Sequence, residues 1–289
     1  MTTSTDTMPG HDGSEAITNS VTTDGMEEDR GKYELHARFH SELLVKDRDV
    51  IVYLPPGYDA EGARRFPVLY LQDGQNLFDG ATAFVYGQHW RVGETADALV
   101  RARAVEPLVI VGIYNAGEKR VDEYTPTHDR RRQIGGQADI YGRFLVEELK
   151  PFIDARYRTL TDAANTGLGG SSLGGLVSLH LGIKHPQVFG KLAVLSPSIW
   201  WDRRVILRKV RTLEAKAALR IWIDVGTEEG GYAVKDAAML RDALVRRGWV
   251  EDVDLKYLEA VGAQHNELAW AERVGPVLEF LFPHGAQGG

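Results

Sequence analysis

The sequence predicts an α/β protein in which one mostly parallel, eight-stranded sheet carries helices on both faces. Two observations lead to this prediction. Segments such as 68–71 and 108–111 are continuously apolar, and such runs are typical of parallel strands that are buried on both faces. Stretches with helical apolar spacing alternate with these segments along the chain, which implies right-handed crossovers and a doubly wound sheet.

The first two predicted strands are separated by only a short polar link, which indicates an antiparallel start of the sheet. The expected strands are 33–39, 43–53, 67–72, 107–114, 166–169, 191–196, 219–226 and 253–259. The expected helices are 90–103, 138–156, 172–185, 203–213, 234–248 and 266–282. The polar segment 115–137 is longer than an ordinary connection, so we expect it to be functional or mobile.

Composition excludes several classes of function. The chain has 289 residues, a formal net charge of −7 and no cysteine. The acidic balance argues against nucleic acid or an anionic membrane as a partner, and the lack of cysteine excludes disulfides, thiolate metal sites and a cysteine nucleophile. We expect neither a metal nor an organic cofactor. No apolar run reaches the ~18 residues of a membrane span and no signal-peptide pattern is seen, so the expected location is the cytoplasm.

Composition also divides the chain into three parts. Residues 1–30 are rich in Ser, Thr and acids and hold no aromatic residue, so we expect a disordered tail. Residues 31–284 are expected to form one domain, and a hydrophobic content of 43% for the whole chain is ample for its core. Residues 285–289 are expected to be a flexible C-terminus. A homo-oligomer is compatible with the sequence, but no feature indicates one.

Residues 170–174 read Gly-Ser-Ser-Leu-Gly, which is the G-x-S-x-G pattern of a nucleophile elbow and singles out Ser172. In an elbow the serine lies on a strained turn between a strand and a helix, and the glycines let the backbone pass close to it. The context agrees, since a short strand ends near Leu168 and a helical apolar surface continues until Pro186. The alternative is a plain glycine-rich loop before a core helix.

A serine hydroxyl needs a general base within hydrogen-bond reach, and in elbow folds the chain order is serine, acid, histidine. Only His265 and His284 lie far enough beyond Ser172. His265 comes between a predicted strand and a helix, which places it at the carboxyl edge of the sheet, whereas His284 follows the last helix. We expect His180 and His185 to be structural residues of the elbow helix. His265 is therefore the predicted base.

The acid is expected on the loop after the strand 219–226. Glu228 and Glu229 lie at the sheet edge there, whereas Asp224 lies within the strand and is expected to face a structural partner. These observations leave both glutamates as candidates for the acid.

An oxyanion hole needs backbone N–H donors aimed at the developing negative charge. One donor is expected from Leu173, directly after the serine. The other is expected from Gln75, because Gly74 permits the required turn after strand 67–72. The alternative is that 73–74 forms a simple tight turn.

Several segments together resemble the putative-esterase (esterase D-like) branch of the α/β-hydrolase superfamily. Besides the elbow, the resemblance is carried by 52–58, 70–76, 123–126, 144–157, 196–201 and 226–229, and it covers roughly 33–282. This branch includes feruloyl and acetyl-xylan esterases, S-formylglutathione hydrolase, siderophore esterases and the antigen 85 mycolyltransferases. The resemblance implies the α/β-hydrolase fold for the domain 31–284 and a catalytic role for it.

The resemblance also implies roles for single residues. Ser172 and His265 fall on the catalytic serine and histidine of the branch, and Glu229 falls on the acid of a G-T-x-[DE] pattern. Gln75, the residue after Asp-Gly, falls on the second oxyanion donor. The chain departs from many relatives in having glutamate rather than aspartate as the acid, and in having Asp-Gly at 73–74 where relatives often have His-Gly.

The expected function is a serine carboxylesterase that acts through an acyl-enzyme on a small-molecule ester, either polar and short-chained or aromatic. The expected pocket residues are Trp90, Arg120, Arg130, Trp200 and Trp201, because aromatic faces beside guanidinium groups suit planar polar esters better than lipid chains. The alternatives for these side chains are core packing and solvated charges.

Other activities share the same chemistry. They are a siderophore (enterobactin-type) esterase, a thioesterase such as S-formylglutathione hydrolase, and an acyltransferase. A different class of function, a non-catalytic ligand-binding module, would keep the fold without needing the serine and histidine.

Overall fold

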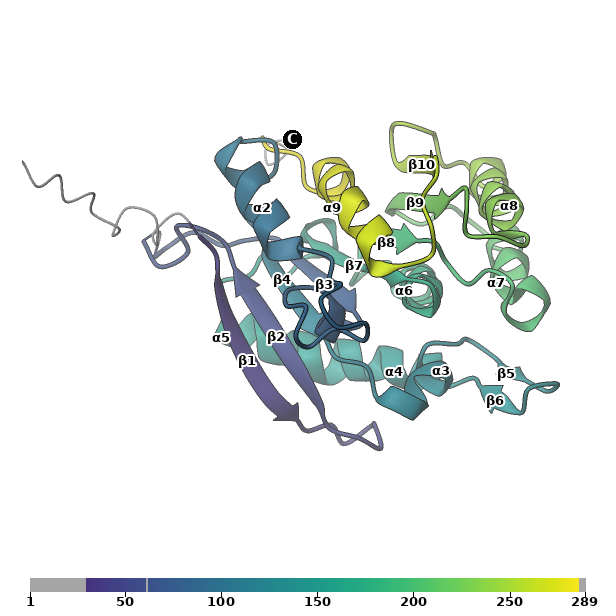
Figure 1. Cartoon of the computed structure of the whole chain (residues 1–289), viewed down its shortest axis with the longest axis horizontal. Coiled ribbons are helices and arrows are strands. Elements are labelled where there is room, and N and C mark those ends of the chain that lie inside the picture. The colour runs from purple at the N-terminus through teal and green to yellow at the C-terminus, as the bar shows by residue number, and fades with distance from the viewer. Residues whose placement is uncertain (1–29, 61, 286–289) are drawn as a thin grey trace, which may run out of the picture.

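The computed structural model describes residues 30–60 and 62–285. In this part of the chain, eight strands form one sheet in the order β1-β2-β4-β3-β7-β8-β9-β10 (Figure 1). β2 is antiparallel to both β1 and β4, and all other neighbouring strands are parallel. The predicted mostly parallel sheet with an antiparallel start is confirmed. Apart from Arg30 and Gly285, the two predicted terminal segments lie outside the described residues.

The strands follow the predicted segments, with one clear difference at the second. Their bounds are β1 Lys32–Phe39, β2 Arg48–Leu54, β3 Val68–Gln72, β4 Val109–Ile113, β7 Thr166–Ser171, β8 Lys191–Leu195, β9 Arg220–Gly226 and β10 Leu255–Ala260. The sequence predicts a strand from residue 43, but β2 begins at Arg48. The chain turns before it because the Ser41 hydroxyl accepts hydrogen bonds from the amides of Leu43 and Leu44, each at 3.1 Å. Such local side-chain bonds compete with a sheet ladder.

Helices cover both faces of the sheet. The helix bounds are α2 Val92–Arg101, α4 Ala138–Arg143, α5 Lys150–Arg156, α6 Leu173–Lys184, α7 Trp201–Arg211, α8 Ala233–Arg246 and α9 Glu267–Leu281. α2 and α9 share one apolar core with the sheet, and the other five share a second core on the opposite face. α4 continues into α5 through a π-helical segment, Phe144–Leu149, so the predicted helix 138–156 is present without interruption.

The long segment 115–137 contains structure that the sequence pattern does not predict. It holds a one-turn helix, α3 (Arg120–Glu123), and a small hairpin of β5 (His128–Asp129) and β6 (Ile134–Gly135). A buried ion pair ties α3 to the sheet, because Glu123 accepts hydrogen bonds from both terminal nitrogens of Arg48 at 2.9 and 3.0 Å. The hairpin projects at one end of the molecule (Figure 1).

The carboxyl ends of β3, β7, β8, β9 and β10 lie at one edge of the sheet, because these strands are parallel. The loops that follow them are therefore neighbours in space. They are the segments 73–76, 172, 196–200, 227–232 and 261–266. The predicted serine, acid, histidine and oxyanion residues all fall in these loops or directly beside them.

Candidate active site

Ser172 lies on the sharp turn between β7 and α6. Its backbone has φ 58° and ψ −122°, a strained conformation for a residue with a side chain. Gly170 and Gly174 allow this turn, since a Cβ atom at either position would lie 2.9–3.0 Å from the Cβ of Gln72. The Ser172 amide donates to the carbonyl of Leu195 at 3.0 Å, which fixes the turn on β8. The strand, turn and helix therefore have the geometry of a nucleophile elbow.

The Ser172 side chain is partly exposed and faces a cavity of about 810 Å³. Its hydroxyl lies 3.2 Å from the hydroxyl of Ser198, which is its hydrogen-bond partner among the described residues. His265 lines the same cavity, together with Gln75, Arg120 and residues of the loop 82–88. The imidazole and the hydroxyl thus face a common space in which an ester would contact both.

His265 lies in the loop between β10 and α9. Its Nδ1 is 2.8 Å from Oε2 of Glu229, and its ring packs edge-on against Trp270 with centroids 4.9 Å apart. A carboxylate can only accept a hydrogen bond, so Nδ1 carries a proton, and in the neutral form of the imidazole Nε2 is then the nitrogen with the free lone pair. The ring is thereby oriented with a basic nitrogen available to the cavity.

Glu229 is held in place by three donors. In addition to His265, its Oε1 accepts hydrogen bonds from the Ser196 hydroxyl at 2.5 Å and from the Gly226 amide at 2.6 Å. Burial by itself raises the pKa of Glu229, but the hydrogen bonds from these three groups outweigh it and the net pKa is lowered from 4.5. The side chain, only 2% exposed, is therefore a buried carboxylate that is ionised at neutral pH.

The structure separates the two candidate acids. Glu228 is exposed and directs only its amide inward, to the carbonyl of Ala263 at 3.0 Å, whereas Glu229 contacts His265. Gly226 is required for this arrangement, because a Cβ there would lie 2.2 Å from the Ala263 carbonyl oxygen and 3.0 Å from Oε1 of Glu229.

Asp224 is fully buried below this loop and contacts other partners. It accepts hydrogen bonds from Trp222 Nε1 and Arg273 Nη1, both at 2.8 Å. Burial raises its pKa to about 6, against the opposing effect of Arg273 and the Trp222 hydrogen bond. It faces a structural partner, as its place within β9 predicts, and it does not reach His265.

Ser196 and Arg273, which the sequence patterns do not single out as site residues, connect the two buried carboxylates. The Ser196 hydroxyl donates to Glu229 and accepts from Trp270 Nε1 at 2.9 Å and Arg273 Nη2 at 3.3 Å. Ser196 itself has a positive φ of 42°. The Ser-Pro sequence at the end of the predicted strand 191–196 is the signal that could have indicated Ser196. No pattern in the last helix indicated the partner of Arg273.

The two residues whose amides are predicted to form an oxyanion hole each lie in the first turn of a helix. Leu173 is the first residue of α6 and Gln75 lies in the first turn of a short 3-10 helix, Gly74–Asn76, so neither amide has an acceptor within its own helix. The turn depends on Gly74, since a Cβ there would lie 2.5 Å from the backbone carbon of Gly112. Asp73, before it, has a left-handed φ of 57°.

The predicted pocket residues divide into two groups. Arg120 lines the cavity at Ser172, where it forms a bidentate ion pair with Asp73 at 2.7 and 2.8 Å. Trp200 is 49% exposed and lines a second cavity that also includes His265. These two side chains lie beside the candidate site.

The other three expected pocket residues lie elsewhere, which corrects the prediction. Trp90 is 3% exposed and packs on Trp270 with ring centroids 5.7 Å apart. Trp201 is 1% exposed and its indole N–H donates to the carbonyl of Thr127 at 3.0 Å. Arg130 is exposed in the turn of the β5–β6 hairpin and lines neither cavity. Trp90 and Trp201 are therefore buried residues of the core, and Arg130 is a solvated surface charge.

The described residues contain neither a cluster suited to a metal ion nor a helix suited to cross a membrane. Within 30–60 and 62–285, no group of three or more His, Asp or Glu side chains is placed to hold a metal ion. None of the described helices has the length and apolar character needed to cross a membrane.

The sheet order, the elbow and the carboxylate-bound histidine at the sheet edge define an enzyme of the α/β-hydrolase type. A sequence model of the putative esterase family matches residues 41–276. The chain therefore belongs to the putative esterase family and is a carboxylic ester hydrolase.

The chain is similar to several curated proteins over different lengths. It is 28% identical to the protein YbbA of Bacillus subtilis over 254 residues, which is 84% of this chain and 95% of YbbA. It is 25% identical to an endo-1,4-beta-xylanase/feruloyl esterase of Xylanibacter ruminicola, over 84% of this chain but 30% of that protein. It is 33% identical to the ferri-bacillibactin esterase BesA of Bacillus subtilis, over 50% of this chain and 52% of BesA.

Among solved structures, an IroE-like serine hydrolase from Shewanella oneidensis has the same fold. The TM-score is 0.69 at 22% sequence identity, over 87% of this chain and 80% of that chain.

Proposed function

We propose that the domain 31–284 hydrolyses carboxylic esters through an acyl-enzyme on Ser172, with His265 as general base and acid and Glu229 as the group that orients it. The observation that carries this proposal is the 2.8 Å hydrogen bond between His265 Nδ1 and Glu229 Oε2, combined with the cavity that His265 and Ser172 share. The bond commits one ring nitrogen to the carboxylate and leaves the other to take a proton.

In the first half-reaction, Ser172 Oγ attacks the ester carbonyl carbon while Nε2 of His265 takes the hydroxyl proton. The amides of Gln75 and Leu173 stabilise the oxyanion that forms. When the intermediate collapses, the alkoxide leaves and receives that proton from His265. Water then attacks the acyl-enzyme with the same proton transfers, which releases the acid and restores Ser172.

The Ser172 hydroxyl must turn from Ser198 toward His265 for this step. In the unliganded site the Ser172 and Ser198 hydroxyls are 3.2 Å apart, and catalytic hydrogen bonds commonly tighten only when substrate is bound. We therefore expect substrate to displace the contact with Ser198.

We infer that the substrate is a small ester with a polar short acyl group or an aromatic group. The cavity at Ser172 is bordered by exposed aromatic and apolar side chains, Phe84 and Val85, and by the polar residues Gln75, Asn76 and Arg120. Such a lining suits a planar polar group better than a long alkyl chain. The names of the relatives, a feruloyl esterase and a siderophore esterase, agree with this class.

A fluorophosphonate probe tests the proposed nucleophile directly, because it bonds covalently only to an activated serine. We expect one adduct, located by peptide mass spectrometry on Ser172, and no labelling of Ser172→Ala. A Ser171→Ala variant is the matched control and should be labelled like the wild type. Labelling that persists in Ser172→Ala would contradict the assignment.

A further inference from the structure

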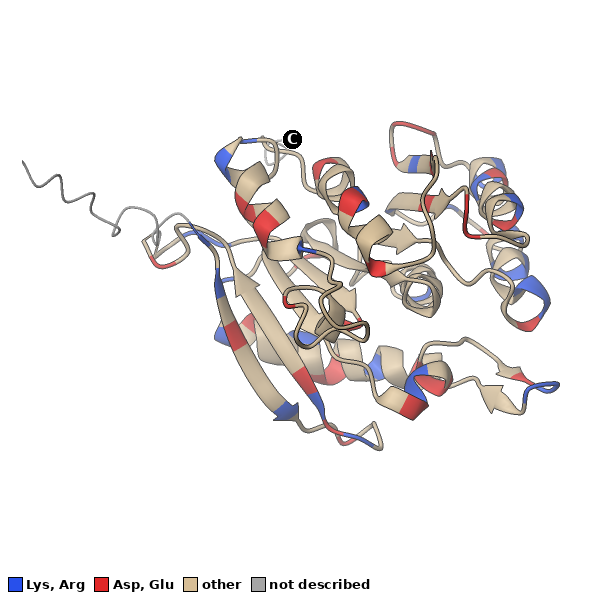
Figure 2. Ribbon diagram, viewed as in Figure 1, with Lys and Arg blue, Asp and Glu red and all other residues tan. Residues whose placement is uncertain are grey.

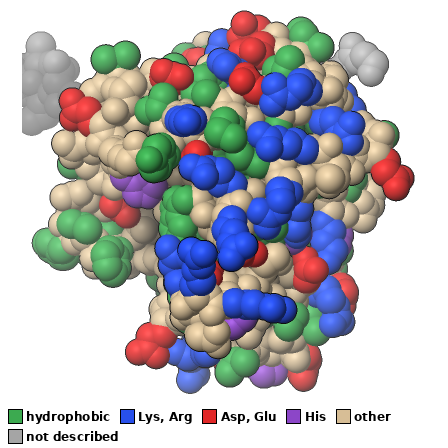
Figure 3. Space-filling view, turned by 90° about the vertical axis from the view of Figure 1, so that its right-hand side faces the viewer, with side chains coloured by type: hydrophobic (Ala, Val, Ile, Leu, Met, Phe, Trp, Pro, Cys, Tyr) green, Lys and Arg blue, Asp and Glu red, His purple; other side chains and the backbone are tan. Residues whose placement is uncertain are grey.

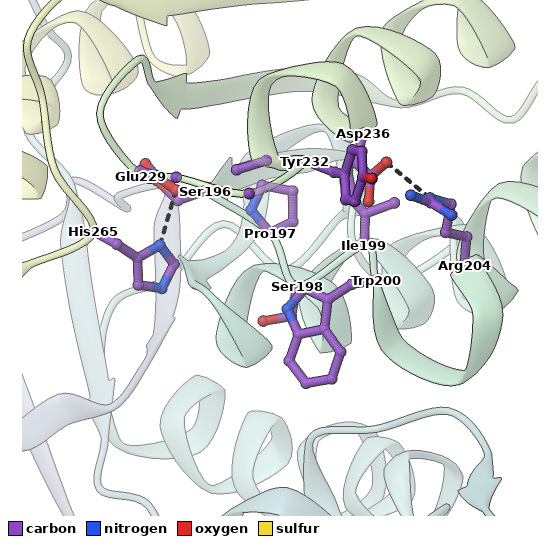
Figure 4. Close-up of a pocket in the computed structure, with 13 residues that line it drawn as sticks. Ser196, Pro197, Ser198, Ile199, Trp200, Arg204, Glu229, Tyr232, Asp236 and His265 are labelled. Atoms are coloured by element: carbon purple, nitrogen blue, oxygen red, sulfur yellow. Dashed lines mark hydrogen bonds and ion pairs between the residues drawn. The ribbon is translucent and has the colours of Figure 1, made fainter.

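A second cavity, of about 460 Å³, also borders His265. His265 and Glu229 lie at one end of it, and Arg204 and Asp236 lie at the other (Figure 4). Its walls come from the segments after β8 and β9. No residue of the 73–76 loop lines it, so it is distinct from the space in front of Ser172.

Two exposed aromatic side chains border this cavity on opposite sides (Figure 4). Trp200 is 49% exposed and Tyr232 is 68% exposed, although large aromatic side chains are usually mostly buried. Pro197 and Ile199 lie between them. The two rings and this apolar floor bound a space between Trp200 and Tyr232, here called the slot, whose aromatic and apolar lining suits an aromatic group.

A guanidinium group closes the far end of the slot. Arg204 donates from Nε to Oδ1 of the buried Asp236 at 2.8 Å, and its guanidinium carbon lies 5.9 Å from the ring centre of Tyr232. Among the described residues, Asp236 holds the Arg204 side chain through Nε, and the two terminal nitrogens are placed to bind a ligand. A planar fork of this kind matches a carboxylate or another anionic oxygen pair.

A second guanidinium lies over the other ring. The guanidinium carbon of Arg132, from the turn between β5 and β6, is 5.0 Å from the ring centre of Trp200. Arg132 also donates from Nη1 to Asp129 at 2.6 Å. Trp200 and Tyr232 therefore each lie next to an arginine. Arg132 is paired with Asp129, and Arg204 is paired with Asp236.

The backbone that presents Arg204 is strained. Asp202, Arg203 and Arg204 all have left-handed φ values, of 38°, 55° and 62°. Thr127 supports this turn, because its hydroxyl donates to Oδ2 of Asp202 at 2.7 Å. Strained backbone of this kind persists only where the surrounding contacts determine it, and it is concentrated at ligand sites.

Positive charge extends beyond the slot over the same face. Lys and Arg side chains gather on the side of the molecule that carries α7, α8 and the β5–β6 hairpin (Figures 2 and 3). The exposed members include the three arginines 130–132 and, on α7, Arg203, Arg208 and Arg211. A basic face on a chain whose net charge is −7 attracts anions locally.

We propose that the slot between Trp200 and Tyr232 is a subsite for an anionic aromatic group of the ester, with Arg204 as the residue that binds its charge. The subsite rests on the proposed esterase function, since it borders His265. It narrows the substrate class to esters in which an aromatic ring bears a carboxylate or another acidic oxygen group.

The test compares the binding of 4-hydroxybenzoate with that of 4-hydroxybenzamide, which is neutral and nearly the same shape. Quenching of tryptophan fluorescence on the full chain gives both dissociation constants. We expect the acid to bind about 10-fold more tightly than the amide, as one charge-assisted contact predicts. Arg204→Gln should bring this ratio close to one, and high salt should do the same in the wild type.

Arg211→Gln is the matched control, because it removes the same charge from an exposed position at the end of α7. It should keep the preference for the acid. Tyr232→Ala, at a 68% exposed position, should weaken both ligands without endangering the fold. Equal binding of acid and amide by the wild type, or an equal effect of Arg204→Gln and Arg211→Gln, would overturn the subsite.

Hydrolysis of p-nitrophenyl acetate by the same preparation separates the two proposals. An active enzyme that binds acid and amide equally contradicts the subsite alone. A preparation that discriminates between the ligands but shows no Ser172-dependent hydrolysis contradicts the proposed function.

Discussion

Nη1 of Arg273 lies 2.8 Å from Oδ1 of Asp224 and 3.8 Å from Oε1 of Glu229, so one buried guanidinium compensates two buried carboxylates. Only one of these, Glu229, contacts His265. The other, Asp224, lies within β9 and holds Arg273 by a hydrogen bond. Glu229 is thus held by residues from separate parts of the chain, which include Ser196 directly after β8, Gly226 at the end of β9 and Arg273 in α9.

The first prediction concerns this shared cation. Arg273→Met removes the charge that compensates Asp224 and Glu229, and leaving a buried charge without its partner costs about 3–5 kcal/mol. We expect the free energy of unfolding, measured in urea, to fall by about that amount. In the Arg273→Met/Asp224→Asn double variant the loss should be smaller than the sum of the two single losses. If the loss in the double variant equals the sum of the two single losses, Arg273 and Asp224 do not stabilise each other.

The second prediction concerns the nucleophile. Ser172→Ala removes the hydroxyl that forms the acyl-enzyme, so kcat for p-nitrophenyl acetate should fall by several orders of magnitude, about 10⁴-fold or more. The side chain is only partly buried, and the circular dichroism spectrum should not change. Ser171→Ala, one residue earlier at the end of β7, should change kcat far less. Comparable rates for wild type and Ser172→Ala would refute the mechanism.

The third prediction separates the two glutamates. Glu229→Gln keeps the shape but removes the charge beside His265, and by analogy with other triads kcat should fall by about 10²–10⁴-fold. Glu228→Gln changes an exposed side chain and should alter kcat by no more than about twofold. The measurement is kcat at a fixed neutral pH. A greater loss for Glu228→Gln would reverse the assignment.

The fourth prediction concerns the pH dependence of the stability that Glu229 contributes. Its folded pKa lies below 4.5, so its ionised form stabilises the fold. This contribution is fully present above pH 4.5 and is lost as pH falls through the folded pKa. The difference in unfolding free energy between wild type and Glu229→Gln should therefore shrink below pH 4.5. A difference that stays constant with pH would show that the loss comes from packing and not from charge.

The sequence predicted the sheet well, and the structure brings the three proposed triad residues to one edge of it, with His265 in contact with Glu229 and on the same cavity as Ser172. Continuous apolar segments mark buried parallel strands, and parallel strands bring their carboxyl ends to one edge whatever the side-chain details. The order of Ser172, Glu229 and His265 along the chain then suffices to place them together. Position along the chain left Glu228 and Glu229 both open, and only the family resemblance favoured Glu229; the turn at Gly226 shows how the fold brings the Glu229 side chain, and not that of Glu228, to His265.

The pocket was harder to predict because neighbouring residues take opposite environments. Trp200 and Trp201 are adjacent in sequence, yet they are 49% and 1% exposed, since the chain enters α7 between them. The contact of Ser196 with Arg273 spans 77 positions, and Tyr232 and Arg204 meet only where the loops after β8 and β9 pack. Such contacts are determined by tertiary packing, which the local periodicity of apolar residues in the sequence does not encode.

The last prediction concerns the ion pair of Arg120 with Asp73, which lies beside Gln75, a proposed oxyanion donor. Arg120 holds both carboxylate oxygens of Asp73 at 2.7 and 2.8 Å, directly before the turn that carries Gln75. If Arg120 positions this loop, Arg120→Gln should lower kcat by about 10-fold or more with little change in KM, since loss of one oxyanion donor costs 10²–10³-fold. Arg120→Lys, which keeps the charge, should recover part of the rate. Lys119→Gln, at the exposed neighbouring position, should behave like the wild type. A rise in KM at unchanged kcat would instead show that Arg120 contributes equally to binding of the substrate and of the transition state. Arg120 would then not be needed to position the segment 73–76.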